Sequence, residues 1–205
     1  MCIIVVKPAP VQFSINTLMN MWVNNPHGAG FMCSDGNELT VVKGLMNFEH
    51  FLGEYYKHAA KKMVMHFRWR THGPVRKTLT HPFKIAENVA FVHNGMIPWV
   101  KVKENESDTS VYAETLERRY TDVFAALERP QTRKFIVGEI GFSKLAFMNS
   151  VGTVKILNGQ MGHMGDNGCW YSNHSYKNFL SYDKKYGNVD YNRNLWIPSA
   201  DVLTL

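Results

Sequence analysis

The chain has 205 residues, of which 45% are hydrophobic and 20% are charged, with a net charge of +6 and three cysteines. This length favours one domain with a sizeable core, and no apolar run is long enough to cross a membrane. The three cysteines form no CxxC pattern, which argues against a disulfide framework and favours a reducing, cytoplasmic compartment.

The positive charge is spread along the chain. Its densest runs are pairs such as Lys61-Lys62 and Arg118-Arg119. A basic excess can favour a nucleic-acid partner, but this scatter favours an ordinary basic surface and leaves nucleic acid as the weaker alternative. The sequence has no internal repeat and no low-complexity segment. We therefore expect a single domain over residues 1–205.

The elements of the first third are predicted from hydrophobic patterns and turn residues. Ser14 is placed to cap a helix that the run Asn24–Pro26 ends. Residues 34–37 have the chemistry of a hairpin turn. In chain order, the predicted elements are a buried strand at Cys2–Lys7, a helix at Ser14–Val23, strands at Gly30–Cys33 and Leu39–Lys43, a helix at Asn47–Lys61 and a strand at Met63–Trp69.

A loop rich in Gly, Pro, Thr and His follows at Thr71–Pro82. The pattern of Gln131–Ile140 is ambiguous. The other predicted elements are a strand at Val89–His93 that ends in the turn Asn94-Gly95, a helix at Asp108–Leu127, and short strands at Leu145–Asn149, Thr153–Leu157 and Cys169–Ser172. Strands and helices in this order, with hairpin-length connections, predict an α+β fold with two antiparallel sheets and helices outside them.

Cys2 directly follows Met1, and a small second residue favours removal of the initiator methionine. The mature chain would then begin with a residue that carries both a thiol and a free α-amine. This amine titrates near pH ~7.7–8.0 and can act as the general base for the thiol. Taken alone, Cys2 is better explained as a small apolar residue that opens a strand. A catalytic role for Cys2 therefore needs support from other residues of the chain.

Three further polar segments stand at strand ends or a helix start, where side chains can face a cleft. An amino-acid substrate needs a guanidinium for its carboxylate and a carboxylate for its ammonium, which Arg68 and Asp108 can supply. Thiolate attack on its side-chain amide creates an oxyanion, and the Asn94 amide and Gly95 N–H can donate to it. Taken singly, Arg68 is more simply explained by a buried salt bridge, Asn94-Gly95 by a hairpin turn and Asp108 by a helix cap. Because these residues occur together behind Cys2, they favour a functional site.

These segments resemble the class II glutamine amidotransferase domain, an N-terminal nucleophile hydrolase. This domain is the glutaminase part of glucosamine-6-phosphate synthase and of amidophosphoribosyltransferase. Residues His66–Gly73 match its His-x-Arg-Trp-x-Thr-His-Gly segment at six positions and carry most of the signal. His93-Asn94-Gly95 matches its oxyanion turn, Ser107-Asp108-Thr109 its amine-binding segment, Cys2 its processed nucleophile and His81-Pro82 a further His-Pro pair. The resemblance covers the chain firmly from Cys2 to about Thr109 and extends loosely to Ser172-Asn173, where a strand of the fold is expected.

The resemblance implies a four-layer αββα fold in which Cys2 forms a γ-glutamyl thioester from glutamine and releases ammonia, then glutamate. It implies no cofactor and no metal. Because the chain leaves no room for a synthase domain, we expect a separate synthase or acceptor subunit to use the ammonia. The implied catalytic residues are Cys2, Asn94 and Gly95, and the implied substrate-binding residues are Arg68, Trp69, Thr71, His72, Gly73 and Asp108.

The sequence departs from the family pattern at Arg70, where a small residue is usual, and at Ser110, where Glu is usual. Two alternatives therefore stay open: hydrolysis of another γ-glutamyl amide compound, and a catalytically idle module kept for binding or regulation. Residues 176–205 match no family segment and are interpreted as a family-specific cap. The spacing of His163, Cys169 and His174 is not that of a zinc site.

Overall fold

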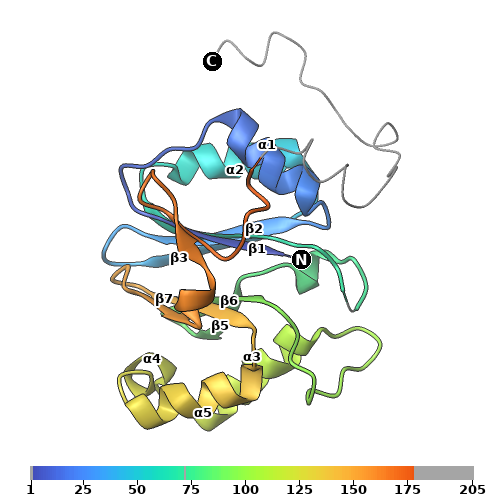
Figure 1. Ribbon diagram of the computed structural model, residues 1–205, viewed down its shortest axis with the longest axis vertical. Coiled ribbons are helices and arrows are strands. Elements are labelled where there is room, and N and C mark those ends of the chain that lie inside the picture. The colour runs from blue at the N-terminus through green and yellow to red at the C-terminus, as the bar shows by residue number, and fades with distance from the viewer. Residues whose placement is uncertain (1, 72, 178–205) are drawn as a thin grey trace.

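The computed structural model describes residues 2–71 and 73–177. Two antiparallel sheets lie face to face, with helices on both outer faces (Figure 1). This confirms the predicted four-layer αββα arrangement. Three predictions fall outside the described residues: the substrate-binding role of His72, the cap beyond residue 177 and the fate of Met1.

The larger sheet has six strands in the order β3-β2-β4-β1-β10-β9. In its centre β1 runs antiparallel to β4, with Ile3 opposite Phe67. This register places Cys2, just before β1, beside Arg68 and Trp69, just after β4. The strands are β1 (Ile3–Lys7), β2 (Ala29–Ser34), β3 (Leu39–Leu45), β4 (Lys62–Phe67), β9 (His163–Met164) and β10 (Trp170–Tyr171).

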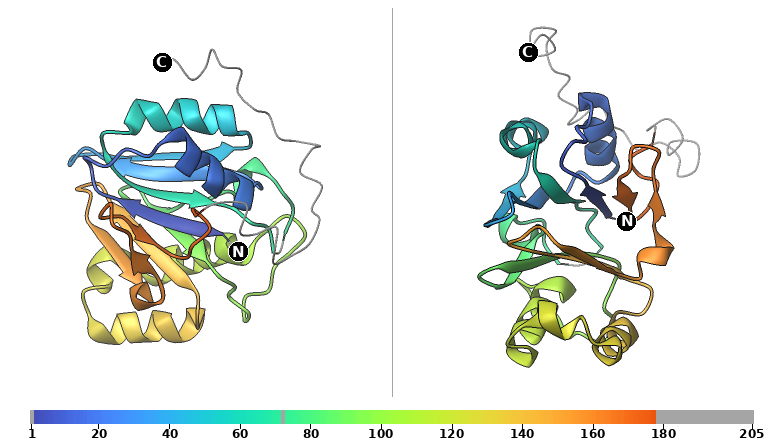
Figure 2. Two further views of the ribbon diagram at one scale, coloured as in Figure 1. Left: turned by 45° about the horizontal axis from the view of Figure 1, so that its top comes forward. Right: turned by 90° about the vertical axis from the view of Figure 1, so that its left-hand side faces the viewer.

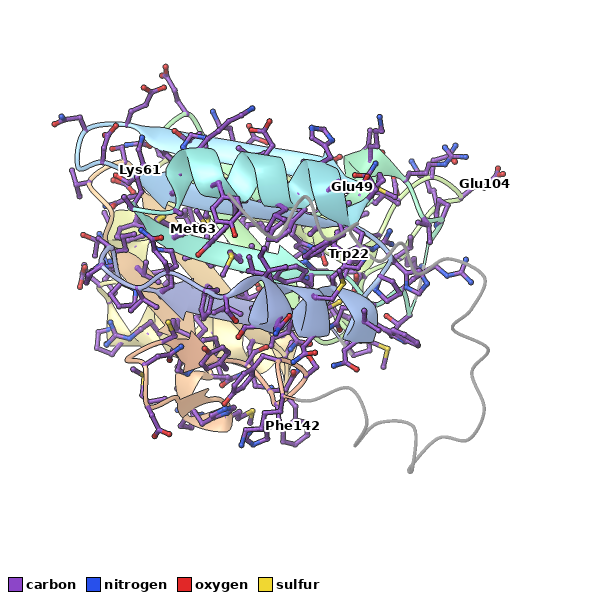
Figure 3. All side chains as sticks on the ribbon, turned by 90° about the horizontal axis from the view of Figure 1, so that it is seen from above. Trp22, Glu49, Lys61, Met63, Glu104 and Phe142 are labelled. Carbon is purple, nitrogen blue, oxygen red and sulfur yellow. The ribbon has the colours of Figure 1, made fainter. Side chains whose placement is uncertain are left out.

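Helices α1 (Ile15–Asn24) and α2 (Phe48–His58) cover the outer face of this sheet. Trp22 lies between them and contacts the rings of Phe48 and Phe51 (Figure 3). Ser14 caps α1 as predicted, because its side chain accepts a hydrogen bond from the Thr17 amide. Helix α2 ends at His58, earlier than the predicted Lys61.

The smaller sheet has four strands in the order β5-β6-β7-β8, and its outer face carries the remaining α-helices, so that Figure 2 shows the four layers edge-on. Its strands are β5 (Phe83–Ala86), β6 (Val89–Asn94), β7 (Lys144–Asn149) and β8 (Val154–Leu157). Its helices are α3 (Asp108–Arg119), α4 (Val123–Ala126) and α5 (Pro130–Ile140), and two short 3-10 turns, η1 (Lys77–Leu79) and η2 (Gly159–Met161), lie in loops. None of the helices within residues 2–71 and 73–177 is long and apolar enough to cross a membrane.

The prediction of one helix over Asp108–Leu127 is wrong. Tyr120 has extended backbone angles and ends α3, and the Asp122 side chain accepts the Ala125 amide at 2.9 Å to start α4. The ambiguous segment Gln131–Ile140 forms α5, with Pro130 in the first turn, where its missing N–H costs no helical hydrogen bond. The short strands β5 and β9 were not predicted.

Side chains of both sheets meet in an apolar layer between them. Because successive strand residues face opposite sides, Ala90 and Val92 of β6 point into this layer, whereas Val89 and Phe91 point to the helices. The next two residues continue the alternation, so His93 faces α3 and Asn94 faces the other sheet. The layer consists of Ile4, Met32, Leu39, Val64, Ala90, Val92, Ala146, Met148 and Trp170.

Gly30, in β2, lies against the loop that carries His81. A Cβ atom at Gly30 would lie 2.1 Å from the His81 carbonyl oxygen and 2.6 Å from that of Val42. We expect Gly30→Ala to lower the free energy of unfolding by roughly 1–3 kcal/mol or more, measured by urea denaturation. The control is Gly53→Ala in α2, where no atom lies within 4 Å of the added Cβ. It should raise the free energy of unfolding by up to about 1 kcal/mol. Wild-type stability of Gly30→Ala would contradict this close packing.

Candidate active site

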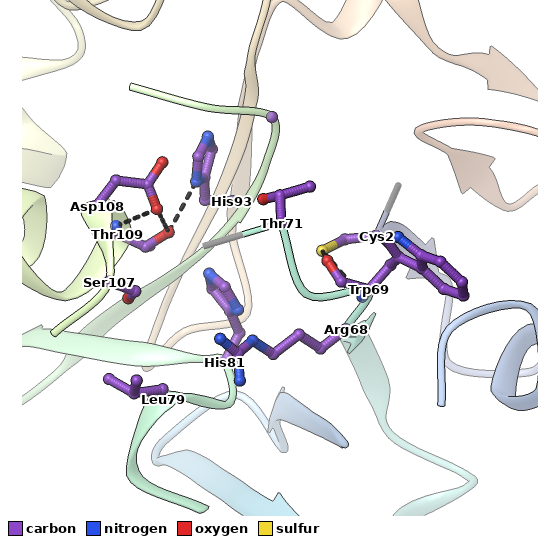
Figure 4. A pocket seen from close by; sticks show the side chains of 11 residues that line it. Cys2, Arg68, Trp69, Thr71, Leu79, His81, His93, Ser107, Asp108 and Thr109 are labelled. Carbon is purple, nitrogen blue, oxygen red and sulfur yellow. Dashed lines mark hydrogen bonds between the residues drawn. The ribbon is translucent and has the colours of Figure 1, made fainter. Parts of the chain in front are cut away.

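A pocket of about 330 Å³, a volume that includes its open mouth, lies at the start of α3 (Figure 4). Its other walls come from the residue before β1, the residues after β4 and the end of β6. Six predicted site residues line the pocket: Cys2, Arg68, Trp69, Thr71, Gly95 and Asp108. Leu79, His81, His93, Ser107 and Thr109 complete the lining. The structure thus brings residues from distant parts of the sequence to one cavity.

The Cys2 thiol is held by the backbone of Trp69. Its sulfur donates to the Trp69 carbonyl oxygen and accepts from the Trp69 N–H, each at 3.3 Å. Burial raises the pKa of the Cys2 thiol, while the hydrogen bond from Trp69 lowers it. The thiol is therefore protonated at neutral pH, and a nucleophilic reaction at this sulfur requires a nearby base.

Arg68 is 4% exposed and places a cation on the pocket wall. Its backbone N–H donates to the Gly28 carbonyl at 2.8 Å, and its carbonyl accepts from the His27 N–H at 3.0 Å. One guanidinium nitrogen donates to the Pro74 carbonyl at 3.0 Å. Burial lowers the pKa of Arg68, but a guanidinium stays charged at neutral pH. In Figure 4 its side chain runs from the Cys2 end of the pocket towards His81.

Two residues of the segment after β4 have surroundings that the sequence did not reveal. Gly73 has a φ of +72°, and a Cβ atom there would lie 2.6 Å from the Glu106 carbonyl oxygen. Gly73 therefore lets this loop approach the loop before α3, and it lies outside the pocket lining. Arg70 is exposed, and its backbone N–H donates to His27 Nδ1 at 2.9 Å. The substrate-binding role of Gly73 stays a prediction.

Asp108 is the first residue of α3, and the helix cap is Ser107. Ser107 and Ser110 form a reciprocal capping box: the Ser107 hydroxyl accepts the Ser110 amide at 3.1 Å, and the Ser110 hydroxyl accepts the Ser107 amide at 2.8 Å. Ser110, which departs from the family pattern, thus supports the helix start. The Asp108 carboxylate accepts from the Ile97 and Thr109 amides at 2.9 and 2.8 Å, near the favourable end of the helix dipole.

A hydroxyl connects this carboxylate to a buried imidazole. Thr109 Oγ1 donates to Asp108 Oδ1 at 3.3 Å and lies 2.8 Å from His93 Nδ1. Since a hydroxyl carries one hydrogen, donation to Asp108 requires that His93 Nδ1 be the protonated ring nitrogen. The order of donors is then His93, Thr109, Asp108, and it fixes the orientation of the carboxylate.

His93 belongs to a cluster of three buried histidines. The rings of His66 and His81 lie 3.9 Å apart between centroids, and those of His81 and His93 lie 6.4 Å apart. Burial lowers the pKa of His66 to about 3, that of His93 to about 4, and that of His81 well below its usual range. All three are neutral at pH 7. In the sequence these histidines stand only as parts of motifs, because their contact depends on the meeting of β4, β6 and the loop before β5.

The two predicted oxyanion donors have different surroundings. Asn94 is 3% exposed, and its Nδ2 atom donates to Ser172 Oγ at 2.7 Å. Gly95 lines the pocket with a φ of +149°, and a Cβ atom there would lie 2.1 Å from Ser143 Oγ. The close packing of Ser143 therefore requires glycine at this position. The predicted approach of a reacting atom to the backbone is a separate reason for glycine.

Ser172 and Asn173 were not predicted as functional residues. Ser172 bonds Asn94, and Asn173 Nδ2 donates to the Cys2 carbonyl at 2.7 Å. The sequence carries no signal for these contacts, because the partners are 78 and 171 positions apart. Only the tertiary structure brings them together.

Among the residues that the structure describes, no group of three or more His, Cys, Asp and Glu side chains is placed to hold a metal ion. The His163 and His174 rings stack at 4.0 Å between centroids, and His163 Nε2 lies 3.1 Å from the Tyr176 hydroxyl. Tyr171 and Tyr176 stack at 3.8 Å beside them. These histidines thus pack in an aromatic cluster.

No family model matches the chain, and no curated protein matches it. Among solved structures, it matches the glutamine phosphoribosylpyrophosphate amidotransferase from B. subtilis complexed with ADP and GMP, at 20% identity and a TM-score of 0.51. It also matches a structure described as the allosteric regulatory enzyme of purine biosynthesis, at 21% identity and a TM-score of 0.51. Each match covers 83% of this chain but 41% of the other, so the chain spans about two fifths of their length. These matches confirm the predicted fold.

The buried histidines predict a pH dependence of stability. Their pKa values are depressed in the folded protein, to about 3 for His66 and about 4 for His93, against ~6.5 in an unfolded chain. The unfolded state therefore binds more protons below pH ~6.5, and the free energy of unfolding should fall as pH drops towards 4, by ~1.4 kcal/mol per pH unit for each histidine.

The contribution of one histidine can be isolated with His81→Phe, since both ring nitrogens of His81 lack hydrogen-bond partners among the described residues. Urea denaturation between pH 4.5 and 6.5 should show a slope reduced by about one proton. The wild type, measured over the same pH range, supplies the reference slope. An unchanged slope in His81→Phe would contradict the assignment.

Proposed function

We propose that this protein is a class II glutamine amidotransferase-type glutaminase, which hydrolyses the side-chain amide of glutamine through a thioester on Cys2. One observation carries the proposal: the Cys2 thiol, the Arg68 guanidinium and the Asp108 carboxylate line the same pocket. A thiol, a fixed cation and a fixed anion match an amino acid that has a carboxylate, an ammonium and a reactive amide. The fold shared with a glutamine amidotransferase supports the same conclusion.

The two charged side chains act as substrate clamps in this proposal. Arg68 pairs with the α-carboxylate of glutamine and Asp108 pairs with its α-ammonium. Both groups are held in place before substrate arrives, Arg68 by its burial and its bond to Pro74, and Asp108 by two backbone amides. Trp69 and Thr71 line the pocket, and the proposal gives a substrate-binding role to these two residues and to His72 and Gly73.

Cys2 is the nucleophile after removal of Met1 exposes its α-amine. The amine takes the thiol proton, the sulfur attacks the amide carbon, and the Gly95 N–H and Asn94 amide donate to the oxyanion. The proton then passes to the leaving nitrogen, the C–N bond breaks, and ammonia departs from the γ-glutamyl thioester. Water attacks the thioester with the amine as base, so that glutamate leaves and the thiol is restored. The raised pKa of Cys2 supports this need for a base.

The proposal includes a separate synthase or acceptor-modifying partner that uses the ammonia. In the matched amidotransferase the shared fold accounts for 41% of the chain, so the larger part of that protein lies outside it. The proposal also includes a cytoplasmic location, since a catalytic thiol works in a reducing compartment and the three described cysteines are unpaired.

The nucleophile is tested by replacing each cysteine. Cys2→Ala should abolish ammonia release from glutamine, whereas Cys33→Ala and Cys169→Ala, at two fully buried positions, should retain activity per folded molecule. A diazo-ketone analogue of glutamine should label Cys2 alone, and intact-mass spectrometry should find active protein lacking one methionine. Labelling of Cys33 or Cys169, or activity with Met1 retained, would contradict the mechanism.

The same assay separates the alternative functions. If the wild type releases no ammonia from glutamine but releases it from another γ-glutamyl amide, the substrate is that compound. If it releases ammonia from neither, the protein is a binding module.

The amine clamp is tested by Asp108→Asn, which keeps the shape of the side chain and removes its charge. The loss should cost roughly 2–5 kcal/mol of glutamine binding and appear mainly as a raised KM, because the contact exists in both ground and transition states. Asp122→Asn is the matched control, since Asp122 also accepts a backbone amide at a helix start but lies outside the pocket lining. It should leave KM unchanged. Equal KM values in Asp108→Asn and wild type would show that the amine binds elsewhere.

A further inference from the structure

Ser172, at the end of β10, connects the two sheets at the active site. It is 2% exposed, and its Oγ atom accepts from the Ile4 backbone amide at 2.8 Å and from Asn94 Nδ2 at 2.7 Å. Its own backbone N–H donates to the Ile4 carbonyl at 2.9 Å. Ile4 belongs to β1, which follows the nucleophile, and Asn94 ends β6 in the other sheet. One hydroxyl therefore bonds to both strands that carry catalytic groups.

Asn173 provides a second connection, to the nucleophile itself. Its Nδ2 atom donates to the Cys2 carbonyl at 2.7 Å. Its Oδ1 atom accepts from the Ser175 amide at 3.0 Å and from the Ser175 hydroxyl at 2.8 Å. Because two donors face the oxygen, the amide can present only its nitrogen to Cys2. The Ser175 hydroxyl also accepts from Asn25 Nδ2 at 3.1 Å, which anchors the segment beyond α1.

We propose that Ser172 and Asn173 are positioning residues that hold the oxyanion donor Asn94 and the nucleophile Cys2 at a fixed relative placement. The inference rests on the proposed function and adds the residues that align its two catalytic groups. Asn94 ends a strand of one sheet and Cys2 directly precedes a strand of the other, and the consecutive residues Ser172 and Asn173 bind one each.

The physical need for Ser172 follows from the symmetry of an amide. The nitrogen and oxygen ends of Asn94 have nearly the same shape, so packing alone does not choose between them. Ser172 Oγ, which the Ile4 N–H holds in place, accepts one N–H of the Asn94 amide and connects its nitrogen end to β1. One N–H of Asn94 thus binds Ser172, and the proposal assigns the second N–H to the oxyanion. A flipped amide would present its oxygen to the developing negative charge.

The test for Ser172 is a double-mutant cycle with Ser172→Ala and Asn94→Ala, followed by ammonia release from glutamine. Loss of one oxyanion donor costs about 10²–10³ in kcat, so loss of its alignment should cost about 10–100-fold, with KM changed less than twofold. In the Asn94→Ala background, Ser172→Ala should lower kcat by less than twofold, because no donor remains to be aligned. Independent, multiplying losses would overturn the role of Ser172.

A matched control separates alignment from general loosening. Asn167 holds the turn before β10 through the Tyr171 hydroxyl and the Cys169 amide, and it contacts neither Cys2 nor Asn94. Asn167→Ala should lower thermal stability and leave kcat per folded molecule at the wild-type value. If Asn167→Ala lowers kcat as much as Ser172→Ala, the segment is merely structural and the proposal fails.

The connection to Cys2 is tested without glutamine, by the rate at which iodoacetamide alkylates Cys2 at pH 7. Asn173→Ala releases the Cys2 carbonyl and should expose the thiol, so that alkylation is accelerated at least threefold, whereas Asn167→Ala should match the wild type. An unchanged rate in Asn173→Ala overturns the role of Asn173. If the wild type releases no ammonia from glutamine, the proposed function fails, but the alkylation rates still decide whether this segment positions the thiol.

Discussion

The pairing of β1 with β4 is the constraint on which the site depends. Ile3 lies opposite Phe67, so the residue before β1 and the two residues after β4 lie side by side at the same end of these two central strands. The Trp69 backbone can therefore hold the Cys2 sulfur from both its N–H and its carbonyl. A slip of one residue would turn every side chain of β1 to the opposite face and remove the thiol from the pocket. The bond from the Ile4 amide to Ser172 Oγ exists only in the observed register and opposes such a slip.

The last two residues of β6 point to opposite faces of their sheet and therefore contact different layers of the fold. His93 faces α3 and, through Thr109, orients the Asp108 carboxylate. Asn94 faces the opposite sheet and meets Ser172. The proposed amine clamp and the proposed oxyanion donor thus depend on consecutive residues that point in opposite directions. This arrangement explains how a four-layer fold collects groups from both sheets and one helix around a single cavity.

Local chemistry predicted much of this structure. Ser14 marked the start of α1, and the apolar runs marked β1, β4 and β6, because caps and buried strands leave patterns within a few residues. The break after α3 was missed because the helical pattern continues across Asp122, whose capping role shows only in its bond to Ala125. The motifs predicted that Cys2, Arg68 and Asp108 meet, and they share a pocket. Ser172, Asn173 and the contact of Gly95 with Ser143 depend on long-range packing, which no local pattern encodes.

The bond between Asn173 and Cys2 also bears on the order of events during synthesis. The two residues are 171 positions apart, so the ribosome makes Cys2 long before it makes the segment that binds it. Closing so long a loop is slow, since contacts of large sequence separation form late in folding. A nascent chain that lacks β10 therefore carries Cys2 without the bonds that Ser172 and Asn173 make to Asn94 and to the Cys2 backbone. The proposed catalytic groups therefore reach their final placement only when β10 has paired with β1.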